Sequence, residues 1–147
     1  NAWILLKSLE TINLRCRTQA ESALKIAKSL EKHPKIKKIT YPYLRTHTQY
    51  SLAKKQMTGG GTVIAIELVG NKKTTFSFLN NLKIISISNN LGDSRSLITH
   101  PATTTHQRLS VPQKKHLGIS DGLVRLSIGL EDVKDLIVDL KQSLATV

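Results

Sequence analysis

Cysteine, aromatic residues and long apolar runs are all scarce in this chain of 147 residues. A single cysteine, Cys16, excludes a disulfide within the chain and favours a reducing, cytoplasmic location. Aromatic residues make up only 4% of the chain, so its core must consist mainly of Leu, Ile, Val and Ala. No apolar run reaches the roughly 20 residues that cross a bilayer. The sequence therefore predicts one domain with a real core and no membrane partner.

Acidic residues are also scarce, with 10 Asp and Glu against 22 Lys and Arg, which gives a net charge of +12. The basic residues are densest in Lys32-His33-Pro34-Lys35-Ile36-Lys37-Lys38. Such a cluster could bind nucleic acid or another anionic surface. No aromatic residues interleave with these charges, and no helix-turn-helix or RNA-binding signature is present. We therefore interpret the cluster as a solvated basic face and predict no nucleic-acid partner.

The chain begins at Asn1, without an initiating methionine, and its first residues already follow a helical pattern. No basic residue precedes the apolar segment Trp3–Leu6, and no clear cleavage site follows it, so a signal peptide is not predicted. These features suggest a fragment of a longer protein.

Apolar residues recur at steps of three and four from Leu5 to Leu30, which predicts one long helix that ends at His33-Pro34. Cys16 lies on the apolar face of that helix, and we expect a buried, inert thiol. Alternation of apolar and polar residues predicts strands over 36–41 and 62–68. The other predicted elements are helices over 48–57, 72–81 and 131–144, strands over 84–88 and 123–128, and a long polar stretch over 98–117 with a helical turn near 112–116.

Gly59-Gly60-Gly61 lies after a predicted helix and before a predicted strand. Phosphate-binding loops have the opposite order, because they follow a strand and precede a helix. We therefore interpret the three glycines as a helix stop and a strand entry.

Arg125 lies in the middle of an apolar, strand-like run, just before an amphipathic helix. A guanidinium is costly to bury unless it is paired or meets an anion. Held by a strand, it could grip a carboxylate through two parallel hydrogen bonds. The alternative is a structural salt bridge to an acid such as Asp121 or Glu131.

Two histidines, His100 and His106, flank Pro101-Ala102-Thr103-Thr104-Thr105 and first suggest a metal site. They lie six positions apart with a proline between them, and no cysteine or acidic residue lies nearby, so the spacing makes a poor chelate. We predict no metal and expect both histidines to be structural hydrogen-bonding residues.

The order and spacing of Leu91-Gly92-Asp93, His100–His106, Leu123–Ser127 and the helix that follows resemble one family in particular. This is the C-terminal domain of the Cys/Met-metabolism enzymes that use pyridoxal 5′-phosphate (PLP), which are cystathionine γ-synthase-like proteins. Ser88-Asn89-Asn90-Leu91-Gly92-Asp93 is more similar to O-succinylhomoserine sulfhydrylases than to γ-lyases.

The resemblance implies an α+β fold, the small C-terminal domain of a fold-type-I PLP enzyme. We expect a mainly antiparallel sheet of about four strands, with helices on one face. Residues 1–33 would be a long connecting helix and residues 34–147 the domain itself. The N-terminal PLP-binding domain would be absent from the chain, and Trp3 and Leu6 could pack on it. Family members are usually tetramers, which implies a homo-oligomer.

The resemblance also implies roles for three residues. Arg125 would bind the α-carboxylate of an amino-acid substrate. Asn90 stands where many members have a serine beside that carboxylate, although a plain turn rich in Asn and Gly is an alternative. Thr105 matches a threonine near the cofactor and the substrate. No residue here is predicted to be catalytic or to bind the cofactor, because no lysine has the family's surrounding motif. No residue is predicted to bind a metal, for the reason of spacing given above.

The implied function is that of a PLP-dependent sulfhydrylase that makes homocysteine from O-succinylhomoserine and sulfide, in methionine biosynthesis. A cystathionine γ-synthase or a γ-lyase of the same family is an alternative, and so is an inactive remnant or association domain. We expect PLP in the full enzyme but not on this chain alone, which should be inactive without the domain of the Schiff-base lysine.

Overall fold

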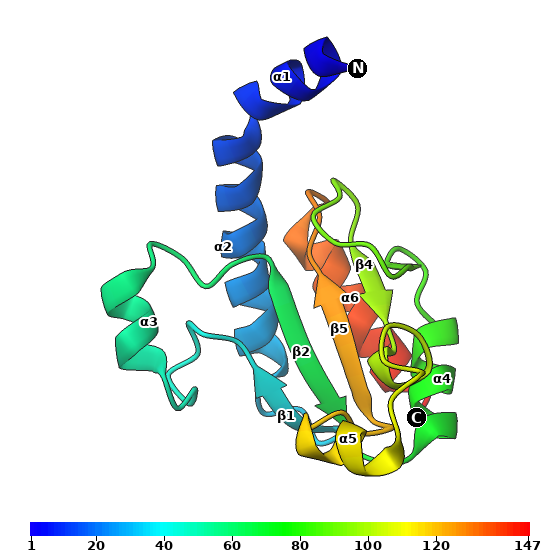
Figure 1. The fold of residues 1–147 in the computed structure, drawn as a ribbon. Coiled ribbons are helices and arrows are strands. Elements are labelled where there is room, and N and C mark those ends of the chain that lie inside the picture. The colour runs from blue at the N-terminus through cyan, green and yellow to red at the C-terminus, as the bar shows by residue number, and fades with distance from the viewer.

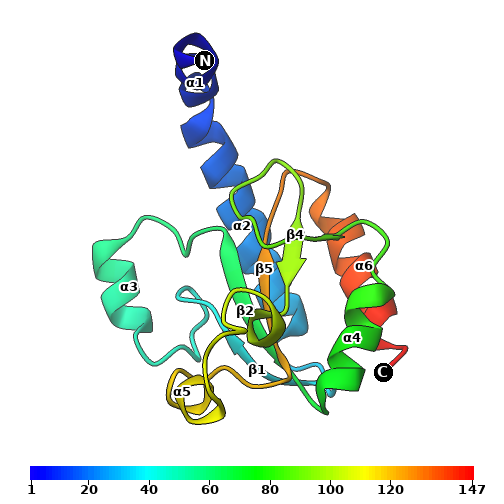
Figure 2. The ribbon, with the colours of Figure 1, turned by 45° about the vertical axis from the view of Figure 1, so that its right-hand side comes forward.

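The N-terminal helical segment is divided in two in the structure, a computed structural model that describes residues 1–147. Helix α1 spans Ala2–Glu10 and α2 spans Ile12–Leu30, with Thr11 (φ −107°, ψ 6°) between them. The Arg15 guanidinium donates to the Ser8 carbonyl at 2.6 Å and so caps an unpaired carbonyl at the end of α1. The predicted continuous helix over 1–33 is therefore wrong at Thr11, where α1 turns away from the axis of α2 (Figure 1 and Figure 2).

A five-stranded sheet forms the centre of the domain, in the order β1-β2-β5-β4-β3. Neighbouring strands are antiparallel except β3 and β4, which are parallel. This confirms the predicted fold class, with one strand more than expected. The additional strand, β4, has three residues that are all buried, so it shows no alternation from which to predict it. The strands are β1 Ile36–Thr40, β2 Val63–Leu68, β3 Ser86–Ile87, β4 Leu97–Thr99 and β5 Leu123–Ser127.

Helices α2 and α6 pack on the same face of this sheet, behind β2 and β5 in Figure 1. Alternation places Ile64 and Ile66 of β2 in the core, and the small side chains of Ala23 and Ala27 allow α2 to approach them closely. Burying an isoleucine side chain contributes roughly 1.5–3 kcal/mol to the stability of the fold. The other helices are α3 Tyr50–Gln56, α4 Lys72–Asn80, the short 3₁₀ helix η1 Pro101–Thr103, α5 Val111–His116 and α6 Val133–Leu144.

The first half of the predicted apolar helix face has no partner within the chain. Trp3 is 68% exposed, and Leu6 and Leu9 are exposed to a similar extent. Cys16 is exposed as well, so the prediction of a core thiol is wrong. The periodicity was identified correctly, but only the part of the stripe from Gln19 onward meets the sheet and α6. None of the helices is long and apolar enough to cross a membrane.

The outer strand β1 is protected against pairing with another chain. Its register with β2 shifts between Ile36 and Lys38, and both Lys37 and Lys38 are exposed. Lysines and irregular pairing are common on sheet edges, because they oppose edge-to-edge association. Lys37 also forms an ion pair with Glu67 at 2.9 Å. Burial acts to raise the pKa of Glu67, but the hydrogen bonds from Lys37 and Ser120 outweigh it and lower that pKa.

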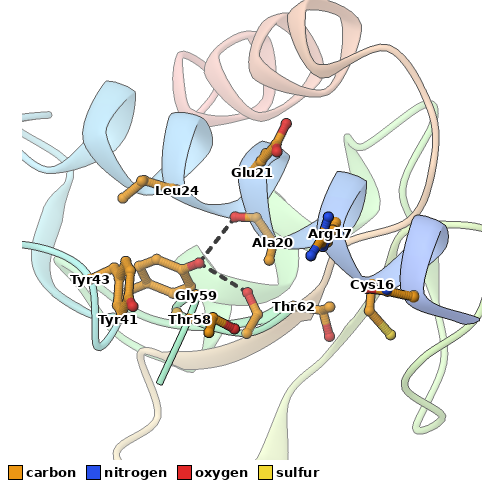
Figure 3. Close-up of a pocket in the computed structure, with 13 residues that line it drawn as sticks. Cys16, Arg17, Ala20, Glu21, Leu24, Tyr41, Tyr43, Thr58, Gly59 and Thr62 are labelled. Carbon is orange, nitrogen blue, oxygen red and sulfur yellow. Dashed lines mark hydrogen bonds between the residues drawn. The ribbon is translucent and has the colours of Figure 1, made fainter. Parts of the chain in front are cut away.

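The three glycines lie between α3 and β2, as predicted, and the structure adds a reason for one of them. The Tyr41 ring packs against Gly60 so closely that a Cβ there would lie 2.5 Å from the ring. The Tyr41 hydroxyl is shared between the Ala20 carbonyl of α2 (3.1 Å) and the Gly61 carbonyl (2.9 Å), as Figure 3 shows. Tyr41 thus joins the glycine segment to α2.

Tyr41 should make the fold sensitive to alkaline pH. Burial, with a smaller repulsion from Tyr43, raises the pKa of Tyr41 to about 12. Because this folded-state pKa exceeds the unfolded value near 10, the stabilisation is complete below pH 10 and is lost as pH rises towards 12. We expect the loss to reach about 2–3 kcal/mol in urea titrations between pH 9 and 12. Tyr41→Phe should be less stable at pH 7 but lack most of this alkaline decline, and an equally steep decline in the variant would contradict the assignment.

Candidate substrate-binding site

Arg125 lies on the face of the sheet that α2 and α6 do not cover. Its neighbours along β5, Val124 and Leu126, are fully buried in the core, so alternation directs Arg125 to the opposite face. Ala65 of β2 and Thr99 of β4 lie directly beside it in the ladder. The side chain is half-buried and stands at the centre of the sheet.

The guanidinium of Arg125 makes hydrogen bonds only to main-chain carbonyls. Its Nη2 donates to Asn89 O at 2.6 Å and to Asn90 O at 3.3 Å. Its Nε is buried and has no hydrogen-bond partner. A buried donor of a charged group without an acceptor is costly, and native structures usually supply one from protein, ordered water or a bound ligand.

The alternative of a structural salt bridge is not found, since no acidic side chain lies within ion-pair distance of Arg125 in residues 1–147. The Glu131 carboxylate instead accepts hydrogen bonds from the Ser96 main-chain N–H (2.7 Å) and hydroxyl (2.9 Å). Asp121 contributes its carbonyl to His100 and Thr75. Arg125 therefore keeps an uncompensated positive charge at the open face.

The segment that faces Arg125, residues 89–96, is held to the domain by hydrogen bonds from three elements. Gln19 of α2 donates to Asp93 O at 2.7 Å, and the Gly92 N–H donates to the Ser127 hydroxyl of β5 at 3.0 Å. Glu131, just before α6, binds Ser96 as described above. The segment is exposed apart from Ser96, and these bonds hold it against the domain.

A buried carboxylate of α6 fixes the main chain directly before β3. Asp139, 3% exposed, accepts main-chain hydrogen bonds from Lys83 (2.8 Å), Ile84 (3.0 Å) and Ile85 (3.1 Å). Burial acts to raise the pKa of Asp139, but these bonds and one from Gln142 outweigh it and lower that pKa. No sequence pattern marked Asp139, because aspartate in a helix is usually a solvated residue.

Of the predicted site residues, Arg125 and Asn90 come together and Thr105 lies apart. Asn90 contacts Arg125 through its main-chain carbonyl, and its main-chain N–H donates to the Ser88 hydroxyl, whereas its exposed side-chain amide makes no hydrogen bond within the chain. Thr105 is exposed, and its hydroxyl lies 2.8 Å from His106 Nδ1 rather than near Arg125. Two residues that sequence reasoning missed, Asn89 and Thr99, belong to the Arg125 cluster. Only the ladder register, which places Thr99 beside Arg125, could have identified the latter.

Both histidines hydrogen-bond within the chain, as the sequence suggested. His100 is buried, and its Nε2 lies 3.0 Å from Asp121 O while its Nδ1 lies 2.8 Å from the Thr103 hydroxyl. Since a carbonyl only accepts, Nε2 carries the proton and Nδ1 accepts from Thr103. The ring also packs edge-on against Phe76. His100 thus joins β4, α4 and the segment before β5.

A groove of about 690 Å³ lies elsewhere, between α2 and the glycine segment (Figure 3). Arg125, Asn90 and Thr105 are not among the residues that line it. Its Tyr41 hydroxyl is already bonded to two carbonyls, and no metal-binding group of His, Cys, Asp or Glu lies anywhere in residues 1–147.

No lysine in residues 1–147 has the buried setting that activates a Schiff-base amine. Lys114 is the only lysine that is half-buried, and its Nζ donates to Ala102 O at 2.8 Å. The residues present therefore fit the carboxylate end of an amino acid but not a covalent anchor for an aldehyde cofactor.

Comparison with known proteins identifies the family of the chain. The sequence pattern of the Cys/Met metabolism PLP-dependent enzymes matches residues 1–145. The chain belongs to this family. It is 48% identical to an O-succinylhomoserine sulfhydrylase of Mycobacterium tuberculosis over 99% of the chain, and 42% identical to an L-methionine gamma-lyase of Fusobacterium nucleatum over 100%.

A solved family structure has the same fold. The cystathionine gamma synthase of Xanthomonas oryzae pv. oryzae, in complex with aminoacrylate and cysteine, superposes with a TM-score of 0.94 at 36% identity over 99% of the chain. The chain spans 37% of the length of the two relatives named above and 38% of this one. The family is PLP-dependent and acts in sulfur amino-acid metabolism.

Proposed function

We propose that this chain is the C-terminal part of a PLP-dependent sulfhydrylase that converts O-succinylhomoserine and sulfide to homocysteine and succinate. In this reaction the Cγ–O bond to succinate breaks and a Cγ–S bond forms, without oxidation or reduction. The observation that carries the proposal is the Arg125 guanidinium, which stands on the open sheet face without an acidic partner and with a buried Nε that lacks an acceptor. An α-carboxylate supplies both the acceptor and the counter-charge.

The role of Arg125 in this proposal is to orient the substrate. A carboxylate held by the guanidinium and a second donor has a restricted orientation, and this determines which bond at Cα is aligned for cleavage. The amide of Asn90, which is exposed and unpaired, could donate a further hydrogen bond to the same carboxylate. Thr105 would take part only if its exposed loop moved towards Arg125 when the substrate binds. When bound, PLP would supply the electron sink that this chemistry requires.

The N-terminal PLP-binding domain is the partner that the proposal requires. The exposed apolar stripe of α1 and the first half of α2 is a surface on which it could pack, because large apolar patches on a monomer mark interaction sites. Trp3 and Leu6 would belong to that contact.

A γ-lyase activity is the second candidate, favoured by the 42% identity to an L-methionine gamma-lyase. To separate the two, the chain would be co-expressed with the N-terminal remainder of the M. tuberculosis relative and supplied with PLP. We expect homocysteine and succinate from O-succinylhomoserine with sulfide, and little methanethiol from methionine. Faster release of methanethiol than of succinate would favour the lyase, and no turnover of either substrate by a PLP-loaded complex would contradict both.

The chain alone should not retain the cofactor. After incubation with PLP and desalting, we expect no bound-cofactor absorbance and no stoichiometric adduct in the intact mass after borohydride reduction, because its lysines are solvated and no buried amine is available. The co-expressed complex is the positive control. A stable one-to-one adduct on the chain would show that the anchor lies within it.

A further inference from the structure

Thr99 is the residue of β4 that lies directly opposite Arg125 in the antiparallel ladder. It is only 1% exposed, yet it is polar and carries a hydroxyl on the Arg125 side of the sheet. Its Oγ1 donates to the side-chain Oδ1 of Asn89 at 2.7 Å and lies 3.0 Å from the Thr104 hydroxyl. An amide oxygen only accepts, so the single Thr99 proton is used for Asn89.

Asn89 connects this hydroxyl to the guanidinium. Its side chain is held by Thr99, while the carbonyl oxygen of the same residue accepts the 2.6 Å hydrogen bond from Arg125 Nη2. Asn89 is itself exposed, so little packing would hold its carbonyl in place without that bond. Thr104 closes the cluster, with its hydroxyl 2.8 Å from His100 O and 3.0 Å from Thr99.

We propose that Thr99 is a positioning residue, which holds Asn89 so that its carbonyl secures one nitrogen of Arg125 and fixes the orientation of the guanidinium for a carboxylate. The inference rests on the proposed carboxylate-binding role of Arg125. A guanidinium secured on one side loses less conformational freedom when an anion binds on the other, so preorganisation raises affinity. Thr99 itself touches neither substrate nor cofactor.

The test uses the full 147-residue chain, with sodium acetate as the carboxylate probe and sodium chloride at equal ionic strength as the blank. The readout is the Arg125 Nε–H resonance, assigned by its loss in Arg125→Lys. In the native chain we expect acetate, but not chloride, to shift this resonance. Thr99→Val keeps the shape of the side chain but removes the hydroxyl, and it should weaken the acetate affinity about fivefold, the effect of one hydrogen bond. Thr99→Ser should restore the affinity to within about twofold.

Asn89→Ala provides a second route, because the residue is exposed and its loss should not affect folding. It removes the other end of the same hydrogen bond, so the variant should match Thr99→Val, and the double variant should be no weaker than either. Thr75→Val, which removes an equally buried hydroxyl from α4, controls for general loosening and should bind acetate normally.

The outcomes separate the two proposals. A native chain in which acetate does not move the Arg125 resonance would overturn both the carboxylate-binding role and the positioning role. A native chain that responds, with Thr99→Val and Asn89→Ala equal to it, would overturn the positioning role alone. Equal weakening by Thr75→Val would also overturn it, because the effect would then be general.

Discussion

Arg125→Ala, in a PLP-loaded complex that contains this chain, is expected to lower kcat/KM for O-succinylhomoserine by about a hundredfold or more, the cost of losing one side of a charged, hydrogen-bonded pair. The physical reason is that neither neighbour of Arg125 in the ladder can replace its charge. The Arg125 Nε is the buried donor without an acceptor, and its neighbours in the ladder, Ala65 and Thr99, carry no charge. Steady-state kinetics over a range of substrate concentrations would measure the effect.

The loss should appear in both constants. KM should rise because the carboxylate loses its counter-charge, and kcat should fall because a loosely held substrate samples orientations that do not react. Arg125→Lys keeps the charge but not the planar fork, so we expect an intermediate loss of about tenfold. Arg45→Ala, which removes an exposed arginine far along the chain, is the matched control. Wild-type kinetics in Arg125→Ala would end the proposed assignment.

Asp139→Ala is expected to reduce the free energy of unfolding by about 3 kcal/mol, because three main-chain N–H groups lose their common acceptor. The Ile85 N–H is buried and cannot turn to water, whereas those of Lys83 and Ile84 can be partly rehydrated. Urea unfolding followed by circular dichroism would measure the change. Asp135→Ala, on the exposed side of the same helix, should cost less than about 1 kcal/mol.

The same carboxylate should make stability depend on pH in the acid range. Its folded-state pKa lies below the usual value, because the hydrogen bonds outweigh the effect of burial. The unfolded state therefore binds the proton more readily, so the contribution is present above about pH 4 and is lost as pH falls towards the folded-state pKa. Asp139→Ala should unfold with a flatter acid profile than the native chain. An unchanged acid profile would show that other carboxylates control it.

Local patterns in the sequence predicted most elements of this fold. Alternation in β2 and β5 determined which face of each strand is buried, since side chains on a strand point to opposite sides. The apolar stripe of α2 predicted its buried face from Ala23 onward, because residues three or four positions apart lie on the same side of a helix. The same stripe was misleading at Cys16, because periodicity shows that a face is apolar but not whether anything in the chain covers it. β4 escaped prediction because three buried residues carry no period.

The sequence by itself determined the α+β class, the family and the identity of Arg125 as the outstanding residue, because an arginine in an apolar strand is unusual wherever it occurs. Only the tertiary structure decided that Arg125 lacks an acidic partner, that Glu131 binds Ser96 instead, and that Asn89 and Thr99 stand beside the guanidinium. These contacts join residues 10 to 36 positions apart. Their geometry depends on how strands pair and loops close, which no local spacing of residue types can encode.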